Sequence, residues 1–435
     1  MKRNRCITNG SVNKLNAEDR AAHDWYRFVL SFPPHLVRDY IRRFSIRSDQ
    51  LVLDPFCGTG TTLVECKKLG IPTVGIEANP MAYFASKVKV DWNPNPTGLT
   101  EHVNKIAETA RAELESQGIE DYPALFNMGQ IQIDRLRTLS AETQKLLLTD
   151  SISPLPLHKT LVLLSHLKQQ SDERYTNHEM LALANSLVFS ISNLHFGPEV
   201  GVGPAKSDAP VIAAWLDRVY AMADDLRQIV KAKDVPAIVY HGDSRQLSNL
   251  LEPGSIDVVI TSPPYPNEKD YTRTTRLESV LLGFMRDKNE LQTFKRGLMR
   301  SNTRNVYKGD DDDQWVSTYP EINRIAEDIE KRRIELGKTS GFERLYARVT
   351  KLYFGGMARH LADLRTALRP GARLAYVVGD QASYLRVMIN TGQLLAIIAR
   401  SLGYEVIGID LFRTRLATAT REQLREEVVL FRWPG

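Results

Sequence analysis

Five consecutive residues, Thr261-Ser262-Pro263-Pro264-Tyr265, place a hydroxyl and an aromatic ring around two prolines. They follow an apolar run, residues 256–260, which is short and β-branched and therefore predicts a buried strand. The prolines fix the backbone, remove two N–H donors and leave their carbonyls free to accept hydrogen bonds. The stretch predicts a small cup that suits a flat ring with an amino group, although a plain strand-to-loop turn would use the same Pro-Pro pair.

A second stretch, residues 51–62, runs from an apolar strand through a glycine-rich turn into a helix. Gly58 and Gly60 let the backbone approach a ligand closely, and the helix that starts at Thr61 offers free N–H groups. No Gly-Lys-Ser/Thr follows, which excludes the phosphate loop of nucleotide hydrolases, and the third glycine of the dinucleotide fingerprint is missing. The next strand ends in Glu77, at the position where a doubly wound fold holds ribose hydroxyls.

Together these stretches resemble the amino-methyltransferases that use S-adenosylmethionine and act on exocyclic nitrogens of nucleic-acid bases. Residues 54–62 (Asp-Pro-Phe-Cys-Gly-Thr-Gly-Thr-Thr) look like the cofactor loop of that family. Residues 261–265 look like its catalytic loop, in the form most typical of N4-cytosine DNA methyltransferases. Phe32-Pro33-Pro34-His35 resembles the motif that closes over the methionine end of the cofactor. The resemblance covers roughly residues 25–92 and 236–435.

The resemblance implies S-adenosylmethionine as the cofactor, DNA as the partner and N4 of a flipped-out cytosine as the methyl acceptor. The cofactor residues that it implies are Phe32, Pro33, Asp54, Pro55, Phe56, Gly58, Gly60, Thr61, Glu77, Ala78, Asp243 and Ser244. The catalytic residues are Ser262, Pro263, Pro264 and Tyr265. Asp243 follows a third predicted strand, where a residue of the family faces the adenine end of the cofactor.

The residue types of the cup suit this chemistry. An exocyclic amine of cytosine is a poor nucleophile, because its lone pair is delocalised into the ring. The Ser262 hydroxyl and a carbonyl of the proline pair can bond its hydrogens and expose the lone pair, while Tyr265 stacks on the base. Little general-base power is needed, so positioning and preorganisation carry most of the rate. A base inside a duplex cannot reach such a cup and must be flipped out or single-stranded.

Other targets and roles stay open. An N6-adenine target is the closest alternative, since related loops accept both amines; a serine before Pro-Pro, in place of aspartate, favours cytosine. An RNA base N-methyltransferase is a further alternative, and a DNA-binding subunit with a decayed methylation site is another. The C5-cytosine route needs a nucleophilic cysteine that usually follows a proline, and neither Cys57 nor Cys66 does. Cys57 is therefore interpreted as a small packing residue.

Composition sets broader limits. The 435 residues, 25% charged and 43% hydrophobic, indicate a globular protein larger than one ordinary domain. Three cysteines without metal-ligand spacing predict no metal site and favour the cytoplasm. No apolar stretch could span a bilayer, and no signal peptide is expected after Met1. The net charge of +5 permits a polyanionic partner.

The elements that must position these loops predict an α/β fold, a doubly wound Rossmann-like class I methyltransferase sheet with helical insertions. Residues 1–92 and 236–435 form the split catalytic core. Residues 93–235 look almost wholly helical and are a candidate target-recognition region. In the order that this family shows, the acid of the third strand comes before the target-recognition region, whereas Asp243 follows this insertion. A second, irregular insertion at residues 285–345 is therefore another candidate for that region.

The second insertion holds five basic residues without an acid among them. They are candidate DNA contacts: Lys295, Arg296, Arg300, Arg304 and Lys308. The alternative is a solvated loop whose charge is balanced by the four aspartates at 310–313. The expected setting is restriction-modification or phage defence, with a cognate restriction endonuclease or defence-system partner. The recognition sequence and the oligomeric state do not follow from the sequence.

Overall fold

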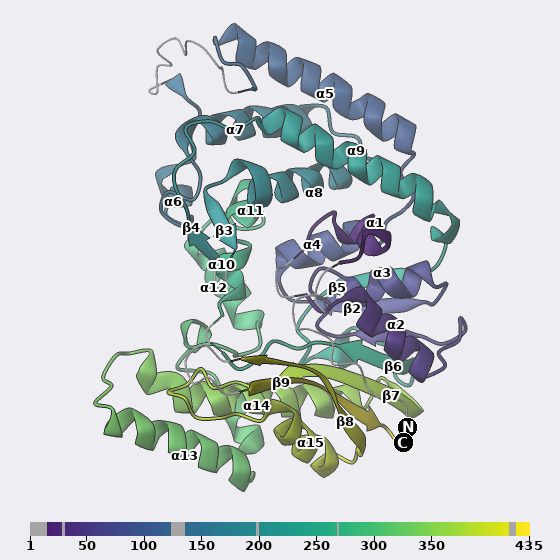
Figure 1. Cartoon of the computed structure of the whole chain (residues 1–435), viewed down its shortest axis with the longest axis vertical. Coiled ribbons are helices and arrows are strands. Elements are labelled where there is room, and N and C mark those ends of the chain that lie inside the picture. The colour runs from purple at the N-terminus through teal and green to yellow at the C-terminus, as the bar shows by residue number, and fades with distance from the viewer. Residues whose placement is uncertain (1–14, 28–30, 123–134, 197–199, 268, 417–422) are drawn as a thin grey trace.

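A seven-stranded sheet in the order β5-β2-β1-β6-β7-β9-β8 forms the centre of the molecule (Figure 1). The computed structural model describes residues 15–435 except 28–30, 123–134, 197–199, 268 and 417–422. The strands of the sheet are β1 (Val52–Asp54), β2 (Thr73–Glu77), β5 (Ala237–His241), β6 (Ile256–Thr261), β7 (Leu368–Gly379), β8 (Glu405–Leu416) and β9 (Gln423–Arg432). The first five strands in the spatial order are parallel, and β9 is antiparallel to both of its neighbours.

This strand order confirms the predicted fold class. The chain moves outward from β1 through β2 to β5 and then returns to β6 on the other side of β1. In a doubly wound sheet, ligands bind outside the carboxyl ends of the strands at the point where the order reverses. Here that point lies between β1 and β6, the strands that precede the two loops singled out in the sequence.

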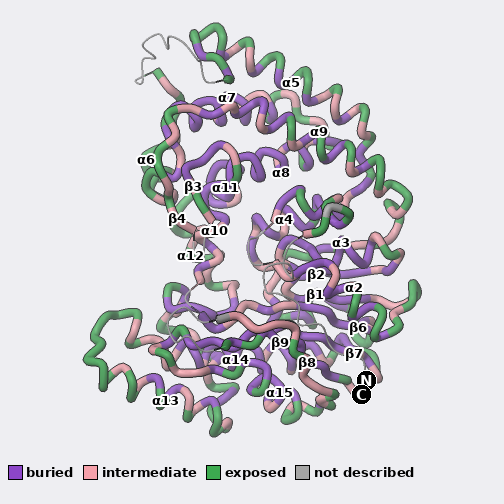
Figure 2. The backbone as a smooth tube through the Cα atoms, viewed as in Figure 1, coloured by how far each residue is buried: buried purple, intermediate pink, exposed green. Residues whose placement is uncertain are grey.

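Helices cover both faces of the sheet, so its strands are apolar on both sides. Val52 of β1 packs in a cluster with α2 (Pro34–Arg43) on one face. Its neighbour Leu53 packs in a cluster with α14 (Tyr346–Leu364) and α15 (Thr391–Ser401) on the other. This alternation is the period of two that a strand imposes. The inner strands of the sheet are mainly buried, whereas the edge strands β5 and β8 are largely intermediate or exposed (Figure 2).

Residues 93–235 form most of a helical layer beside the sheet (Figure 1). Its helices are α5 (Pro96–Ser116), α6 (Ala141–Gln144), α7 (Pro154–Gln169), α8 (Thr176–Ser186) and α9 (Val211–Ile229). Contrary to the almost wholly helical pattern of the sequence, a two-stranded hairpin of β3 (Leu194–Phe196) and β4 (Val200–Val202) lies between α8 and α9. None of the helices in the described residues combines the length and apolar character that a bilayer crossing requires.

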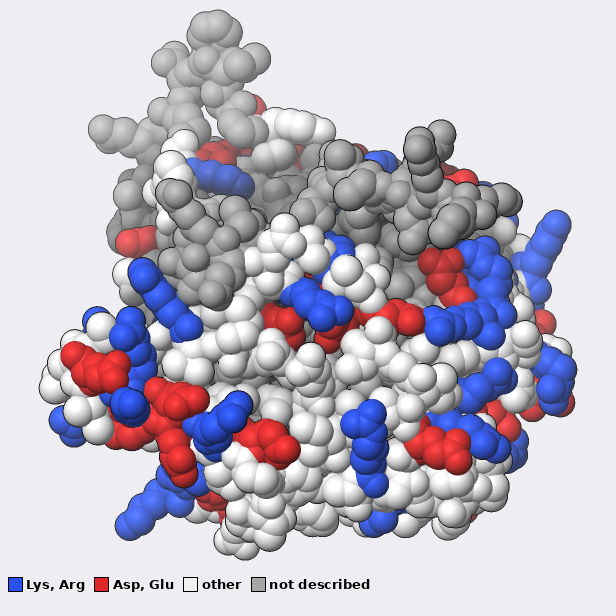
Figure 3. All heavy atoms as spheres, turned by 60° about the horizontal axis from the view of Figure 1, so that its bottom comes forward, with Lys and Arg blue, Asp and Glu red and all other residues white. Residues whose placement is uncertain are grey.

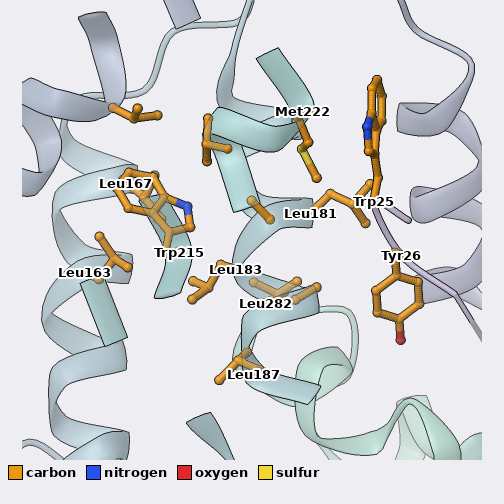
Figure 4. Close-up of a cluster of buried hydrophobic side chains, with 14 of the residues drawn as sticks. Trp25, Tyr26, Leu163, Leu167, Leu181, Leu183, Leu187, Trp215, Met222 and Leu282 are labelled. Atoms are coloured by element: carbon orange, nitrogen blue, oxygen red, sulfur yellow. The ribbon is translucent and has the colours of Figure 1, made fainter. Parts of the chain in front are cut away.

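This helical layer shares one hydrophobic core with segments outside it. Trp215 of α9 and Leu181 of α8 belong to the same buried cluster as Trp25, Tyr26 and Leu282 (Figure 4). The Trp25 indole N–H also donates to Asp225 Oδ2 of α9 at 2.7 Å. The segment that contributes Trp25 and Tyr26 follows α1 (Arg20–His23), and Leu282 follows α11 (Arg276–Leu281). The layer is thus fixed to the chain on both sides of the insertion.

The second inserted segment is more regular than its sequence indicates. It contains α12 (Lys288–Gly297) and α13 (Pro320–Glu335), joined by short 3₁₀ turns. The joining residues lie directly on α14, where a Cβ at Gly355 would sit 1.8 Å from the Asp312 carbonyl oxygen. This close backbone contact fixes residues 297–312 beside the carboxyl edge of the sheet.

Two further helices, α3 (Thr61–Lys68) and α4 (Pro80–Lys89), follow β1 and β2. The short α10 (Tyr271–Thr274) follows the loop after β6. All three begin at the carboxyl edge of the sheet, where the N–H groups of a first helical turn face the loops.

Candidate active site

A cavity of about 310 Å³ lies at the carboxyl ends of the central strands. Both loops singled out in the sequence line it, together with residues from the second inserted segment and from the β8–β9 hairpin. The predicted residues that line it are Phe32, Pro33, Pro55, Phe56, Gly58, Thr61, Glu77, Ala78, Ser244, Ser262, Pro263, Pro264 and Tyr265. Three predicted cofactor residues, Asp54, Gly60 and Asp243, lie outside the lining.

Glu77 is held in place at the end of β2 by two backbone donors. Its Oε2 accepts the Gly58 N–H at 2.8 Å, and its Oε1 accepts the Asn79 N–H at 2.7 Å. Burial raises the pKa of Glu77 to about 7, although both N–H groups favour the charged form. Each carboxylate oxygen can accept a further hydrogen bond. The carboxylate is therefore an acceptor fixed at the cavity wall, as a ribose diol requires.

The two glycines of the loop after β1 serve different purposes. Both have positive φ, +53° at Gly58 and +83° at Gly60, a region that L side chains rarely adopt. A Cβ at Gly58 would meet nothing within 4 Å, so the backbone is open toward the cavity. A Cβ at Gly60 would lie 3.1 Å from Ser86 Cβ, so this glycine permits close packing on α4. Only Gly58 is exposed to a ligand.

Asp54 joins the cofactor loop to the catalytic strand instead of facing the cavity. Its Oδ1 accepts the Thr261 hydroxyl at 2.6 Å and the Phe56 N–H at 3.2 Å. Burial raises the pKa of Asp54 to about 6, against these hydrogen bonds and one from Thr62. The role of Asp54 is thus to set the relative position of the two loops.

The structure places Asp243 outside the lining of the main cavity, in an ion pair. Its carboxylate faces Arg245, whose Nε lies 3.0 Å from Oδ1 and whose Nη2 lies 2.6 Å from Oδ2. Arg245 also forms an ion pair with Asp312, and burial leaves only 8% of its side chain exposed. Gly242 and Ser244 line the cavity at this strand end in place of Asp243. Arg245, two residues from Asp243, is itself held by Asp312, 67 residues further along the chain.

The cup after β6 is formed by Ser262, the two prolines and Tyr265. The Ser262 hydroxyl donates to the Val377 carbonyl of β7 at 3.2 Å and also lies within hydrogen-bonding reach of the Tyr265 phenol. The Tyr265 ring lies against Gly379, where a Cβ would be 2.9 Å from Tyr265 Cε2. Burial and the Glu426 carboxylate raise the pKa of the Tyr265 phenol above its ordinary value, so the ring is neutral.

Several lining residues were missed by the sequence reasoning. They are Asn79, Asn267, Lys269, Tyr271, Asn305, Phe412, Arg413, Arg415 and Glu426, among others. Asn79 had a local signal, because its side chain caps α4 just before Pro80. Asn305 is 1% exposed and its Oδ1 has no hydrogen-bond partner among the described residues. Residues from β8 and β9 carried no recognisable motif.

The five basic candidates of the second insertion differ in how far they are exposed to solvent. Arg300 is buried and pairs through two nitrogens with Asp310, at 2.8 and 2.9 Å, so it is not presented to DNA. Lys295 is 16% exposed and lies 3.5 Å from Asp270. Arg296, Arg304 and Lys308 are exposed. On the face drawn in Figure 3, basic and acidic side chains of the described residues are interspersed.

The sheet order and the acid at the end of β2 define a class I methyltransferase with S-adenosylmethionine as its methyl donor. The residues at the carboxyl edge fit this cofactor. Glu77 offers carboxylate acceptors that could take a ribose diol, Gly58 leaves space beside them, and Phe32 and Pro33 lie in the same cavity.

Comparison with known proteins specifies the class further. The family model described as DNA methylase (N6_N4_Mtase) matches residues 8–87. The chain is 23% identical to the type II methyltransferase M.BsoBI of Geobacillus stearothermophilus, over 99% of this chain and 88% of that protein. It is 23% identical to the type II methyltransferase M.AvaI of a Nostoc species, over 99% of this chain and 89% of that protein. The type II methyltransferase M.MjaII of Methanocaldococcus jannaschii is 35% identical over 27% of this chain and 23% of its own length.

The fold and these matches support an S-adenosylmethionine-dependent amino-methyltransferase of DNA. The matches do not distinguish a cytosine N4 acceptor from an adenine N6 acceptor.

The contact between Tyr265 and Gly379 gives a first prediction. Gly379→Ala places a methyl group against the ring, and overpacking of this kind costs about 1–3 kcal/mol. We expect methyl transfer at saturating DNA to fall by roughly fivefold to a hundredfold, with unchanged cofactor affinity. Gly408→Ala is the matched control, because a Cβ at this β8 glycine meets nothing within 4 Å. Equal turnover of the two variants would show that Tyr265 needs no support from β7.

Glu77 gives a second prediction. Glu77→Ala should weaken S-adenosylmethionine binding by about tenfold to a hundredfold, the value of a charge-assisted hydrogen bond. Ribose hydroxyls favour the charged carboxylate, and the pKa of free Glu77 is about 7. Binding to the wild-type protein should therefore release protons, and affinity should fall as the pH drops from 8 to 6.

Calorimetry across this pH range measures both effects. Glu77→Gln is the control, because it keeps the shape of the side chain and removes its titration. A wild-type affinity that is the same at pH 6 and pH 8 would contradict a charged Glu77 at the ribose.

Proposed function

We propose that this chain methylates N4 of cytosine at specific DNA sites, on a base flipped out of the duplex. The type of residue that precedes Pro263 and Pro264 is the observation that favours cytosine over adenine. A neutral serine, Ser262, stands there in place of an aspartate, and its hydroxyl donates to the Val377 carbonyl. N6-adenine methylation is the alternative, because both amines present two hydrogens.

The residues of the cup act by position. Ser262 and a carbonyl of the proline pair accept the two amine hydrogens and turn the nitrogen lone pair toward the cofactor side of the cavity. Tyr265, neutral and supported by Gly379, stacks on the base and holds its plane. S-Adenosylmethionine supplies, when bound, a methyl group on a positively charged sulfur. The Asp54–Thr261 hydrogen bond fixes the distance between the two loops, which is the main requirement of a displacement in line.

The reaction needs no strong base in the protein. As the amine is alkylated it becomes far more acidic, so solvent water can take the released proton. Ser262 and the proline carbonyl orient the amine hydrogens and need not act as bases.

We also propose a division of labour along the chain. Residues 1–92 and 236–435 carry catalysis, residues 93–235 are the candidate target-recognition region, and residues 285–345 are a second candidate that contacts DNA near the cavity. The type II relatives support a restriction-modification setting. We propose in addition a cytoplasmic location and a cognate restriction endonuclease or defence-system partner.

The product tests the proposed target. The chain is expressed in a host without DNA methylation, and the host DNA is digested to nucleosides and analysed by mass spectrometry. We expect N4-methylcytosine, and Ser262→Ala should lower its amount sharply while cofactor affinity stays the same. A digest that contains N6-methyladenine alone would establish the adenine alternative. Sequencing that detects methylated bases then gives the recognition site.

Arg304 tests the DNA contact of the second insertion. It is exposed, and the next residue, Asn305, lines the cavity. Arg304→Ala should weaken binding to all duplexes alike and reduce the slope of log affinity against log salt by about 1. Arg332→Ala on α13 is the control, since this arginine is 45% exposed and pairs with Glu335. Identical slopes for both variants would remove residues 297–309 from the DNA interface.

A further inference from the structure

The β8–β9 hairpin brings an ion pair to the wall of the catalytic cup. In the sheet register Gly379 of β7 is opposite Glu426 of β9, and Glu426 is opposite Arg413 of β8. Directly opposite residues of antiparallel strands point to the same face. A Cβ at Gly379 would lie 2.9 Å from the Tyr265 ring and 3.4 Å from Glu426 Cγ. Tyr265, Glu426 and Arg413 therefore share one side of the cavity.

A bulge in β8 directs this pair inward. The register of β8 on β9 shifts between Leu411 and Arg413, which makes Phe412 an extra residue. Consecutive residues of a regular strand point to opposite faces, yet Phe412 and Arg413 both line the cavity. Bulges that redirect a side chain are frequent beside active sites.

The Arg413 guanidinium is fixed at one end and free at the other. Its Nε lies 2.5 Å from Glu426 Oε2, and its side chain is 19% exposed. In the described part of the chain, its two terminal nitrogens donate to no other group. A planar guanidinium held in this way presents two parallel donors. Arg415, 3.6 Å from the other Glu426 oxygen, balances the same carboxylate.

Among the bases that carry an amino group, cytosine is complementary to these two parallel donors. Beside its N4 amine it carries two adjacent acceptors, N3 and O2. Adenine carries N1 beside its N6 amine and then a C–H group, so it satisfies only one donor. We propose that Arg413 determines base specificity, donating to N3 and O2 of the flipped cytosine while Ser262 and a proline carbonyl hold N4. This inference rests on the proposed N4-cytosine activity.

Glu426 has a second consequence for the reaction. A lone guanidinium beside N3 and O2 would oppose the positive charge that the base gains as its amine is methylated. The Glu426 carboxylate, which it shares with Arg415, offsets part of that charge and so reduces the cost of placing Arg413 beside the base.

The experiment uses duplexes that contain the methylated site found by sequencing, with either cytosine or 2-thiocytosine as the target base. Sulfur is a much weaker acceptor than oxygen, and N4 is unchanged. Wild-type kcat/KM should fall by about tenfold or more on 2-thiocytosine. Arg413→Lys, which keeps the charge beside Glu426, should lose about as much on cytosine and little further on 2-thiocytosine. Arg432→Lys, whose arginine pairs with Glu405 at 3.1 Å on the outside of the same hairpin, should behave as wild type.

Cofactor affinity, measured by calorimetry, shows that each variant is folded. A wild-type protein that methylates both bases equally would overturn the role of Arg413 without any variant. An Arg413→Lys protein that keeps the full wild-type preference for cytosine over 2-thiocytosine would overturn it as well. A wild-type product of N6-methyladenine alone would instead refute the proposed function, and the inference with it.

Discussion

The hydrogen bond from the Thr261 hydroxyl to Asp54 is the contact on which the rest of the site depends. It is fully buried, it joins residues 207 positions apart, and it connects the ends of β1 and β6. One strand end carries the glycine turn, and the other carries the Ser-Pro-Pro-Tyr cup. A displacement in line tolerates little error in the distance between donor and acceptor. A short bond between strand ends sets that distance more rigidly than contacts between flexible loops would.

The two chemical halves of the cavity are built in different ways. The cofactor half uses residues that lie close together in sequence, such as Gly58, Glu77 and Asn79, held by backbone N–H groups. The base half collects single residues from β6, β7, β8 and β9, and each depends on the sheet register for its position. A register shift of one residue in β9 would turn Glu426 away from Tyr265. The cofactor half is therefore a local structure, whereas the base half exists only in the complete sheet.

This difference explains how much the sequence could predict. The fold class and the position of Glu77 followed from strand patterns and loop residues that act locally. Asp243 and Arg300 form ion pairs with Arg245 and Asp310, contacts that residue type alone does not reveal. Arg413 went unnoticed for another reason. Its direction depends on a bulge, and a bulge is set by the pairing of two strands rather than by a motif in one of them.

The shared core of the helical layer has an evolutionary consequence. Trp25 and Leu282 lie in the same buried cluster as Trp215, although they come from opposite sides of the insertion in sequence. Homologous recombination that exchanged residues 93–235 alone would leave both side chains against unmatched partners, and a mismatch in a packed core costs several kcal/mol. Diversity in this region is thus expected to arise by substitution at its surface and in the β3–β4 hairpin. We therefore expect residues 93–235 to change by point substitution rather than by exchange of the whole segment between proteins.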